Sequence, residues 1–402
     1  MSDLEAFRAE ARAWLQENAP EGVKGIKADE LNGVWGGRNP EFAHPDQKLW
    51  LERMGAKGWT APMWPTEYGG GGLSKAEAKV LSQEMKALGL PPALVGFGLT
   101  MIGPTLLQFG NEEQKQEHLP KIIRGEIRWC QGYSEPGAGS DLASLQTKAE
   151  RDGDHFVING TKVWTSYADQ ADWIFALVRN DNSGIKQEGI TFILIDMDDP
   201  GVSVSPILLI SGKSPFCETH FTDVRVPVKN VIHEIGAGWT VAKALLGHER
   251  SMIADTFGSS AGGTKKAGER SFLSSLAVER VGEQGGRISD PILRDDVARM
   301  EMETKAFGLT TQRTADAAKA GHNPGPESSM FKLYGTELNK TRMELMVRIL
   351  GPDALGWEGE GFDEFALGTT RDWLRSRGNS IEGGTSEVQL NVIAKRVLGL
   401  PA

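Results

Sequence analysis

Two glutamates stand in sequence contexts that suit a general base. The first, Glu382, lies in the glycine-rich stretch "NSIEGGTSEVQ", residues 379–389, among hydroxyl side chains. Acids in polar loops of this kind are most often solvated surface residues. Whether Glu382 takes part in chemistry therefore depends on what the rest of the chain provides.

The second glutamate, Glu249, lies in the segment "GWTVAKALLGHERSMIADTFG". Spacings of four, four and three residues place one set on a single face of a helix: Val241, Leu245, Glu249 and Met252. An acid on an apolar face costs free energy unless it has a partner or a function. Burial there would raise the pKa of Glu249, which suits a general base near neutral pH. The alternative is an ion pair with Arg250.

The segment 130–181 combines a glycine-rich loop with hydroxyl side chains. In "SEPGAGSD" the glycines let backbone N–H groups approach a ligand, and Ser134 and Ser140 supply hydroxyls. In "KVWTS", Trp164 stands two residues before Ser166 at the end of a predicted strand. Taken singly, such a loop is usually a turn and such a tryptophan is usually a core residue. The order of the two motifs carries more information than either one.

Helical and strand patterns divide the chain into three regions. Residues 1–128 and 236–402 carry apolar residues at helical spacing, whereas residues 129–235 contain short runs of β-branched and aromatic residues. Helices, a β insert and helices in that order indicate an α+β protein with segregated layers. We expect an N-terminal helical domain, a small middle β-barrel or sandwich, and a C-terminal helical bundle.

Local signals predict where several of these elements begin and end. Ser74 and Asn111 are predicted helix N-caps, and Glu77 completes a capping box with Ser74. Two Asx-Gly pairs are predicted to be turns between strands: Asp152-Gly153 and Asn159-Gly160. No glycine cluster follows a strand and opens a helix, so a Rossmann-type nucleotide site is not expected.

The composition excludes several classes of protein. The chain has 402 residues, 39% hydrophobic and 24% charged, which suits a globular protein of two or three domains. The net charge of −10 and the lack of a dense Lys/Arg run argue against nucleic-acid binding. Cys130 and Cys217 form no CxxC pair, so no metal site is predicted. Without a signal-peptide core or a membrane-length apolar segment, we expect a cytoplasmic protein that does not bind membranes.

The order of motifs resembles the acyl-CoA dehydrogenase family. "SEPGAGSD" is followed by "NGTKVWTS", then by "FTDVRVPVKNVI", and near the end by "GGTSEVQ" and "RVLGL". The resemblance covers the whole chain. It implies an enzyme that binds FAD and removes two hydrogens across the α,β carbons of an acyl-CoA thioester. A carboxylate would take the α-proton, the β-hydrogen would leave as hydride to flavin N5, and electron-transferring flavoprotein would accept the electrons.

The resemblance also implies roles for residues by their position. Matches to the family's FAD contacts are Gln131, Ser134, Trp164, Ser166, Thr385 and Glu387. Matches on the side of the acyl-CoA are Ser140 and Arg250.

The two candidate bases differ in how they match the family. Many members carry the base directly before Gly-Thr-Ser, where this chain has Gly383, and Glu382 lies one residue upstream. Because near-attack geometry tolerates little displacement, Glu382 does not simply inherit the role. The isovaleryl-type branch carries its base on a helix of the C-terminal domain, directly before an arginine, as in Glu249-Arg250. We predict Glu249 as the base and keep Glu382 as the alternative.

Two family motifs that reach the FAD of a neighbouring subunit are missing. Arg287 is a candidate substitute for a lost arginine, Arg348 stands in place of a glutamine, and Pro352 replaces the second glycine of a double-glycine turn. Similar losses occur in branches that act on steroid side chains, some of which pair two different subunits. We therefore expect a homo-oligomer, either a dimer or a homotetramer, or a heterotetramer.

The same fold is compatible with two functions besides that of a competent dehydrogenase. The chain is either a competent dehydrogenase or an FAD-poor partner subunit of a heteromeric one, and a flavin oxidase or monooxygenase is the third alternative. The acyl chain is also open, because Gly96, Gly98 and Gly103 would either leave room for a wide acyl group or serve helix packing.

Overall fold

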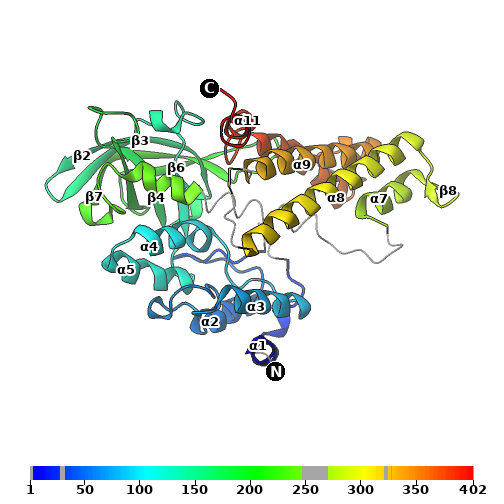
Figure 1. Cartoon of the computed structure of the whole chain (residues 1–402), viewed down its shortest axis with the longest axis horizontal. Helices are drawn as coiled ribbons and strands as arrows, with labels where there is room; N and C mark the ends of the chain where they lie inside the picture. Colours follow the sequence, from blue (N-terminus) through cyan, green and yellow to red (C-terminus); the bar gives the residue numbers. More distant parts are fainter. Residues whose placement is uncertain (1–2, 28–31, 247–269, 321–324, 327, 402) are drawn as a thin grey trace. The chain divides into compact units, whose positions relative to one another are not determined.

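The computed structural model describes residues 3–27, 32–246, 270–320, 325–326 and 328–401. The chain divides into two compact units by its contacts. The first unit comprises Met1–Ile207 and Pro215–His248, and the second comprises Leu208–Ser214 and Glu249–Ala402. The first unit contains both the N-terminal helices and the large sheet (Figure 1). The α+β class with a β insert between helical regions is confirmed.

The N-terminal helices form where the sequence patterns predict them. They are α1 (Asp3–Asn18), α2 (Pro45–Ala56), α3 (Lys75–Ala87), α4 (Gly103–Phe109) and α5 (Glu112–Ile123). Ser74 and Glu77 form the predicted capping box at the start of α3, and Asn111 caps α5 through the backbone N–H of Gln114. These caps satisfy backbone donors that the first helical turn leaves without partners.

A buried ion pair joins α1 to α3. Glu84 on α3 is 4% exposed by its side chain and accepts from Arg8 at 2.6 Å and from Arg12 at 2.7 Å. Hydrogen bonds from both arginines outweigh burial and hold the pKa of Glu84 below its usual range. The two helices are therefore held by charge as well as by the apolar residues Ala11 and Leu15, which are fully buried.

One seven-stranded sheet fills the middle of the described sequence (Figure 1). Its strands are β1 (Trp129–Gly132), β2 (Lys148–Asp152), β3 (His155–Ser166), β4 (Trp173–Arg179), β5 (Ile190–Asp196), β6 (Val202–Ile207) and β7 (Phe216–Pro227). The spatial order is β1-β4-β2-β3-β7-β6, with β5 paired to β4. β1 runs parallel to β4, and β3 pairs antiparallel with both β2 and β7. β4 and β5 are almost continuously buried, which explains their unbroken apolar runs.

One of the two predicted turns is wrong. Asp152-Gly153 lies between β2 and β3 as predicted, and Gly153 has φ 62°. Asn159-Gly160 instead lies inside β3, where the register with β7 shifts between Ile158 and Gly160. Asn159 exchanges hydrogen bonds with Asp223 on β7, so its amide stabilises an irregularity within the ladder and not a chain reversal.

Helix α5 is attached to the sheet within the first unit. The Gln114 side-chain amide donates to the carbonyls of Lys229 at 2.7 Å and Val231 at 2.8 Å. On the same helix, His118 packs edge-on against Trp129 of β1 and Trp173 of β4. Burial lowers the pKa of His118 to about 4, so this imidazole is neutral and serves packing.

The glycines between 96 and 103 serve close packing. An added Cβ at Gly103 would lie 2.0 Å from Cη2 of Trp64, and one at Gly98 would lie 3.1 Å from Ile122. Gly96 has φ 124° and would meet Trp35 at 3.1 Å. These contacts favour the packing interpretation over a cavity for a wide acyl group.

The second unit is helical apart from one short hairpin. Its described elements are α7 (Phe272–Val281), β8 (Glu283–Gln284), β9 (Arg287–Ile288), α8 (Pro291–Lys319), α9 (Ser328–Leu350), α10 (Glu364–Ser376) and α11 (Ser386–Val392). α8 and α9 run alongside each other (Figure 1). Their shared core includes Val297, Met300, Leu345 and Ile349. Among the described residues, no helix has the length and apolarity to cross a membrane.

Candidate functional site

The centre of the candidate site is a bulge in β3 that carries Trp164. Lys162 pairs with Thr219 and Thr165 pairs with Cys217, so two residues of β3 oppose one residue of β7. Trp164 lies in this bulge with φ 60°, a left-handed conformation that is unusual for a bulky residue. Trp164 is 55% exposed, and its ring meets Phe216 edge-on at 6.0 Å. Strained residues of this kind cluster at functional sites.

Ser134 and Ser166 lie close to this bulge along the backbone. The Ser134 carbonyl accepts from the N–H of Val163 at 2.9 Å, which places the segment after β1 directly beside the bulge. Ser166 is the last residue of β3, and the next residue, Tyr167, again has a positive φ of 54°. The structure therefore brings together three residues that the sequence marked as flavin contacts, on neighbouring pieces of backbone.

Gln131 lies on β1, three residues before Ser134. Its register partner on β4 is Phe175, whose ring is fully buried. The side-chain Nε2 of Gln131 is buried and has no hydrogen-bond partner among the described residues. A buried amide donor without a partner costs free energy, so this atom points to a missing acceptor.

A buried ion pair connects the two motifs. Lys162 Nζ lies 2.7 Å from Glu135 Oε1 and 3.2 Å from the carbonyl of Tyr133, and the side chains of Lys162 and Glu135 are 0% and 7% exposed. The Glu135 carboxylate also accepts from the backbone N–H groups of Gln146 at 2.6 Å and Thr147 at 2.9 Å. The Glu135 carboxylate therefore links its own loop to the segment at Gln146 and Thr147 and to strand β3 at Lys162.

The charge states of this pair follow from burial and from each other. Burial alone would raise the pKa of Glu135, but Lys162 and the backbone donors outweigh it and hold that pKa below its usual range. Burial lowers the pKa of Lys162 to about 8, and Glu135 limits the decrease. At neutral pH both groups are charged, so the pair is a true salt bridge inside the unit.

A cation packs against Tyr167 and Trp35, whose ring centroids lie 4.8 Å apart. The Arg128 guanidinium lies 4.8 Å from the ring centroid of Trp35 and 5.4 Å from that of Tyr167. The Arg128 backbone N–H donates to Asp172 at 2.7 Å, and burial raises the pKa of that carboxyl. This arrangement fixes the residue that directly follows Ser166.

Ser140 lies in the exposed part of the same glycine-rich loop. Its neighbour Asp141 accepts from Lys186 Nζ at 3.3 Å and from the Ser144 hydroxyl. Those interactions lower the pKa of Asp141, the Ser144 hydrogen bond being the larger cause. The hydroxyl of Ser140 is thus on the surface of a loop whose base is pinned by Glu135, a suitable place for a solvent-facing part of a ligand.

In the second unit, Glu382 is a surface residue with two partners. Its Oε2 accepts from Arg375 at 2.7 Å and its Oε1 accepts from the Asn379 side chain. The Glu382 side chain is 41% exposed and that of Arg375 is 31% exposed. The next residue, Gly383, directly precedes Gly384-Thr385 and has φ 64°, which favours glycine.

Thr385 and Glu387 begin helix α11. The Thr385 hydroxyl accepts from the N–H of Val388 at 3.2 Å and is the helix N-cap. Hydrogen bonds from its own backbone and from Thr385 lower the pKa of Glu387, which lies in the first helical turn. Gln389, a buried residue that sequence reasoning did not single out, folds back and donates to the carbonyl of Gly383 at 3.1 Å.

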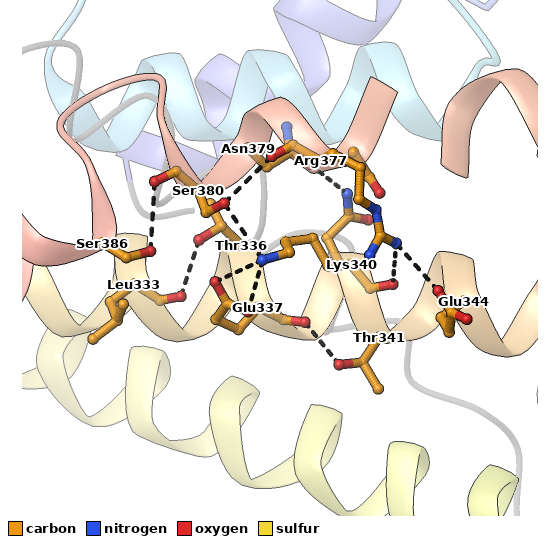
Figure 2. A network of polar contacts seen from close by, with 12 residues as sticks. Leu333, Thr336, Glu337, Lys340, Thr341, Glu344, Arg377, Asn379, Ser380 and Ser386 are labelled. Carbon is orange, nitrogen blue, oxygen red and sulfur yellow. Dashed lines mark hydrogen bonds and ion pairs between the residues drawn. The ribbon is translucent and has the colours of Figure 1, made fainter. Parts of the chain in front are cut away.

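The loop before α11 is attached to α9 by a polar network (Figure 2). Lys340 Nζ contacts the Glu337 carboxylate at 3.1 Å and the Ser380 hydroxyl at 3.4 Å. Arg377 donates to the carbonyl of Lys340 and pairs with Glu344 at 3.6 Å. These contacts hold residues 377–386 against one helix, so Thr385 has a defined place within its own unit.

The predicted base, Glu249, and Arg250 lie outside the described residues. The helix that precedes them in the sequence is described over residues 238–246. Val241 and Leu245, the first two members of the predicted apolar face, are both fully buried. Those two positions agree with the face on which Glu249 was placed, and the role of Glu249 stays a prediction.

The two arginines near the missing motifs have different environments. Arg348 on α9 forms an ion pair with Asp296 of α8 at 2.7 Å, which accounts for a structural role between the two helices. Arg287 is exposed in the β8–β9 hairpin, whose turn residues Gly285 and Gly286 both have positive φ. Among the described residues, no cluster of His, Cys, Asp or Glu could hold a metal ion.

Sequence reasoning missed the Glu135–Lys162 pair, although both residues lie inside the quoted motifs. A signal was present, because Lys162 lies in a run that alternates into the sheet interior, between Ile158 and Thr165. A lysine at such a position requires a buried carboxylate partner. The motif "SEPGAGSD" offers one at Glu135.

Comparison with known proteins covers the whole chain. Models of the acyl-CoA dehydrogenase N-terminal, middle and C-terminal domains match residues 1–126, 130–224 and 236–398. The acyl-CoA dehydrogenase IpdE1 of Mycobacterium tuberculosis is 36% identical over 401 residues, covering 100% of this chain and 99% of that protein. Mitochondrial isovaleryl-CoA dehydrogenase of Pongo abelii is 29% identical, covering 97% and 87%.

Two solved structures are similar throughout. The Tcur3481-Tcur3483 steroid ACAD is 32% identical, with a TM-score of 0.74, covering 100% of this chain and 98% of that one. The ChsE4-ChsE5 complex from Mycobacterium tuberculosis is 29% identical, with a TM-score of 0.70, covering 100% and 98%. With all three domain models matched in order along its length, the chain belongs to the acyl-CoA dehydrogenase family of oxidoreductases, which act on the CH–CH group of acyl-CoA thioesters.

Proposed function

We propose that this chain binds FAD and catalyses the α,β-dehydrogenation of an acyl-CoA thioester. The observation that carries the proposal is the bulge of β3, where a strained and exposed Trp164 lies beside Ser134 and two residues before Ser166. An exposed indole flanked by hydroxyls is suited to a flat heterocycle with hydrogen-bonding edges.

The residues present fit a flavin. Gln131 Nε2 is a buried donor without a described partner, and an isoalloxazine edge carries carbonyl and ring-nitrogen acceptors. Ser134 and Ser166 are half-buried and are proposed to donate to the same ring system, with Trp164 against its face. Thr385 and Glu387 are proposed, from the family resemblance alone, to meet the pyrophosphate portion of FAD.

Each part of the reaction is proposed to depend on a different group. FAD, when bound, supplies the acceptor for the β-hydrogen, which leaves as hydride to N5. Glu249 is proposed to remove the proton from the α-carbon of the thioester, and Arg250 and Ser140 are proposed to hold the acyl-CoA. A base on an apolar helix face keeps its proton affinity high, because burial disfavours the charged carboxylate.

Glu382 is the less favourable base. Its carboxylate has a guanidinium on one oxygen and an amide donor on the other. Both carboxylate oxygens are therefore already engaged, and a substrate α-carbon would have to displace one of these partners to reach the carboxylate. We therefore assign the α-proton to Glu249 and keep Glu382 as the alternative that the test below separates.

The proposed substrate class is a steroid-type acyl-CoA. The support is the 32% identical neighbour described as a steroid ACAD, which this chain matches over its whole length. Electron-transferring flavoprotein is the proposed electron acceptor. The proposed setting is cytoplasmic, with the chain in a homodimer, a homotetramer or a heterotetramer; the neighbour described as the ChsE4-ChsE5 complex pairs two named components.

The test begins with the purified chain. We expect a visible flavin spectrum that is bleached anaerobically by steroid-type acyl-CoA and less by straight-chain, branched or aryl acyl-CoA. Glu249→Gln should bind flavin and abolish the bleaching, whereas Glu382→Gln should retain it. The reverse pattern would assign the base to Glu382. Oxygen consumption during turnover would move the assignment to an oxidase or monooxygenase.

A second candidate function is that of an FAD-poor partner subunit. The specific observation is Arg348, which replaces a family glutamine and is engaged by Asp296 within its own unit. A chain that fails to take up added FAD when alone, but raises flavin content when mixed with a companion chain, would establish this role. Uptake of one FAD per chain by the isolated protein would exclude it.

A further inference from the structure

The Glu135–Lys162 pair lies where the two halves of the proposed flavin contact meet. Glu135 directly follows Ser134, and Lys162 precedes Trp164 by two residues. Between them, the N–H of Val163 donates to the carbonyl of Ser134 at 2.9 Å. The same two segments are thus joined once through backbone and once through a side-chain ion pair of 2.7 Å.

The ion pair fixes the start of the strained bulge. Lys162 is the last residue of β3 in regular register with β7 before the bulge, and its Nζ is held by Glu135 and the carbonyl of Tyr133. A left-handed tryptophan persists only where the surrounding structure determines it strongly. Trp164 itself has a half-exposed side chain, so its conformation must be set by its neighbours along the strand.

Glu135, the acidic member of the pair, is held by further hydrogen bonds. Besides Lys162, the Glu135 carboxylate accepts from the N–H groups of Gln146 and Thr147, at the end of the glycine-rich loop. The turn from Glu135 to Ala138 is closed by two backbone hydrogen bonds of 2.9 and 3.0 Å. Both oxygens of the carboxylate therefore take part in fixing the loop that begins with Ser134.

We propose that Glu135 and Lys162 are positioning residues that set Ser134 and Trp164 for the flavin ring. The inference rests on the proposed function, because it assumes that the ring binds at the bulge. Neither charge needs to touch the cofactor, since both are buried beneath the segments that do. The pair would hold the Ser134 hydroxyl on the loop and the Trp164 indole on the strand in fixed relative positions.

The decisive measurement is FAD affinity across a double-mutant cycle. We expect Lys162→Met to weaken FAD binding by about tenfold or more, and to alter the visible band of the bound flavin. Trp164→Ala should also weaken binding. If Lys162 acts through Trp164, adding Lys162→Met to Trp164→Ala should cost much less than it costs alone. Fully additive effects would overturn the inference.

A matched control separates positioning from general loss of stability. Glu84→Gln breaks another buried ion pair of the first unit, but its partners Arg8 and Arg12 lie on α1, away from the flavin motifs in sequence. We expect this variant to be less stable than the wild type while its FAD affinity and flavin spectrum are unchanged. An equal loss of FAD affinity in Glu84→Gln and Lys162→Met would reduce the pair to a structural role.

A second variant covers the case in which Lys162→Met does not fold. Glu135→Gln combined with Lys162→Met removes both charges and keeps one acceptor for the loop N–H groups. Replacing a buried ion pair by neutral groups is often tolerated. If this double variant folds and binds FAD as tightly as the wild type, the inference is wrong. If the wild type itself binds no FAD, the proposed function has failed instead, so the two failures are distinguishable.

Discussion

Glu135 and Glu382 are both glutamates in glycine-rich loops, and each lies next to residues that we assign to FAD. Glu135 is 7% exposed and is paired with a lysine inside the sheet-containing unit, whereas Glu382 is 41% exposed and is paired with Arg375 on the surface of the helical unit. The two loops are alike in composition, so the difference arises from what packs over them. A loop acid acquires structural importance from its distant partner and not from its local sequence.

The largest effect should come from leaving Lys162 without its carboxylate. We expect Glu135→Ala to lower the free energy of unfolding of the first unit by about 3–5 kcal/mol, because an unpaired charge would remain buried. Urea unfolding followed by tryptophan fluorescence and by hydrogen exchange of residues 133–166 measures it. A loss below about 1 kcal/mol would place this pair in the same class as a surface pair.

Acidification should act on Glu135 in a defined direction. Its folded-state pKa is held below the ordinary value of 4.5, so its contribution to stability is present above that pH and is lost as the pH falls through the folded pKa. We expect the stability of the first unit to fall as the pH is lowered below 4.5. The Glu135→Gln/Lys162→Met variant should show a shallower dependence. Equal slopes in the two proteins would contradict the assignment.

A middle-sized effect should come from Thr385, which caps α11 beside Glu382. Thr385→Val keeps the shape of the side chain and removes the oxygen that accepts from Val388, so we expect a loss of about 1 kcal/mol in the second unit. Thr385→Ser should retain most of the cap. If Thr385→Ser lost as much stability as Thr385→Val, the loss could not be assigned to the cap hydroxyl, and the prediction would be wrong.

The smallest effect should come from Glu382 itself. We expect Glu382→Ala to change the stability of the second unit by no more than about 1 kcal/mol, because its pair with Arg375 is exposed to solvent. Raising the salt concentration should weaken this pair and leave Glu135–Lys162 almost unaffected. A large loss on Glu382→Ala would show that the loop depends on this carboxylate and would remove the contrast.

Much of the fold could be predicted because its signals are local. The helix caps at Ser74 and Asn111 and the strand runs depend on residues a few positions apart, and they were confirmed. The Asn159-Gly160 turn was wrong because a cross-strand partner, Asp223, converts the same dipeptide into an irregularity within a strand. That partner is distant in sequence, so no local rule detects it.

In the candidate site, too, residues in local motifs could be predicted and residues defined by distant partners could not. The residues of the flavin motifs could be named from sequence, and the structure places Ser134, Trp164 and Ser166 on adjoining backbone. Their roles stay predictions, as does that of Glu249. The supporting residues were missed, because Lys162 and Glu135 are 27 positions apart and Gln389 acts by folding back on its own loop.

The attachment of α5 to the sheet has a consequence for the order in which the chain is made. The amide of Gln114 finds its carbonyl partners only at Lys229 and Val231, which are 115 and 117 positions later. During synthesis the N-terminal helices leave the ribosome well before those partners exist. A chain interrupted near residue 128 would expose the α5 surface that His118 and Gln114 occupy, and would become a substrate for chaperones. We therefore expect the first unit to become stable cooperatively and late in synthesis, after the last strand of the sheet has left the ribosome.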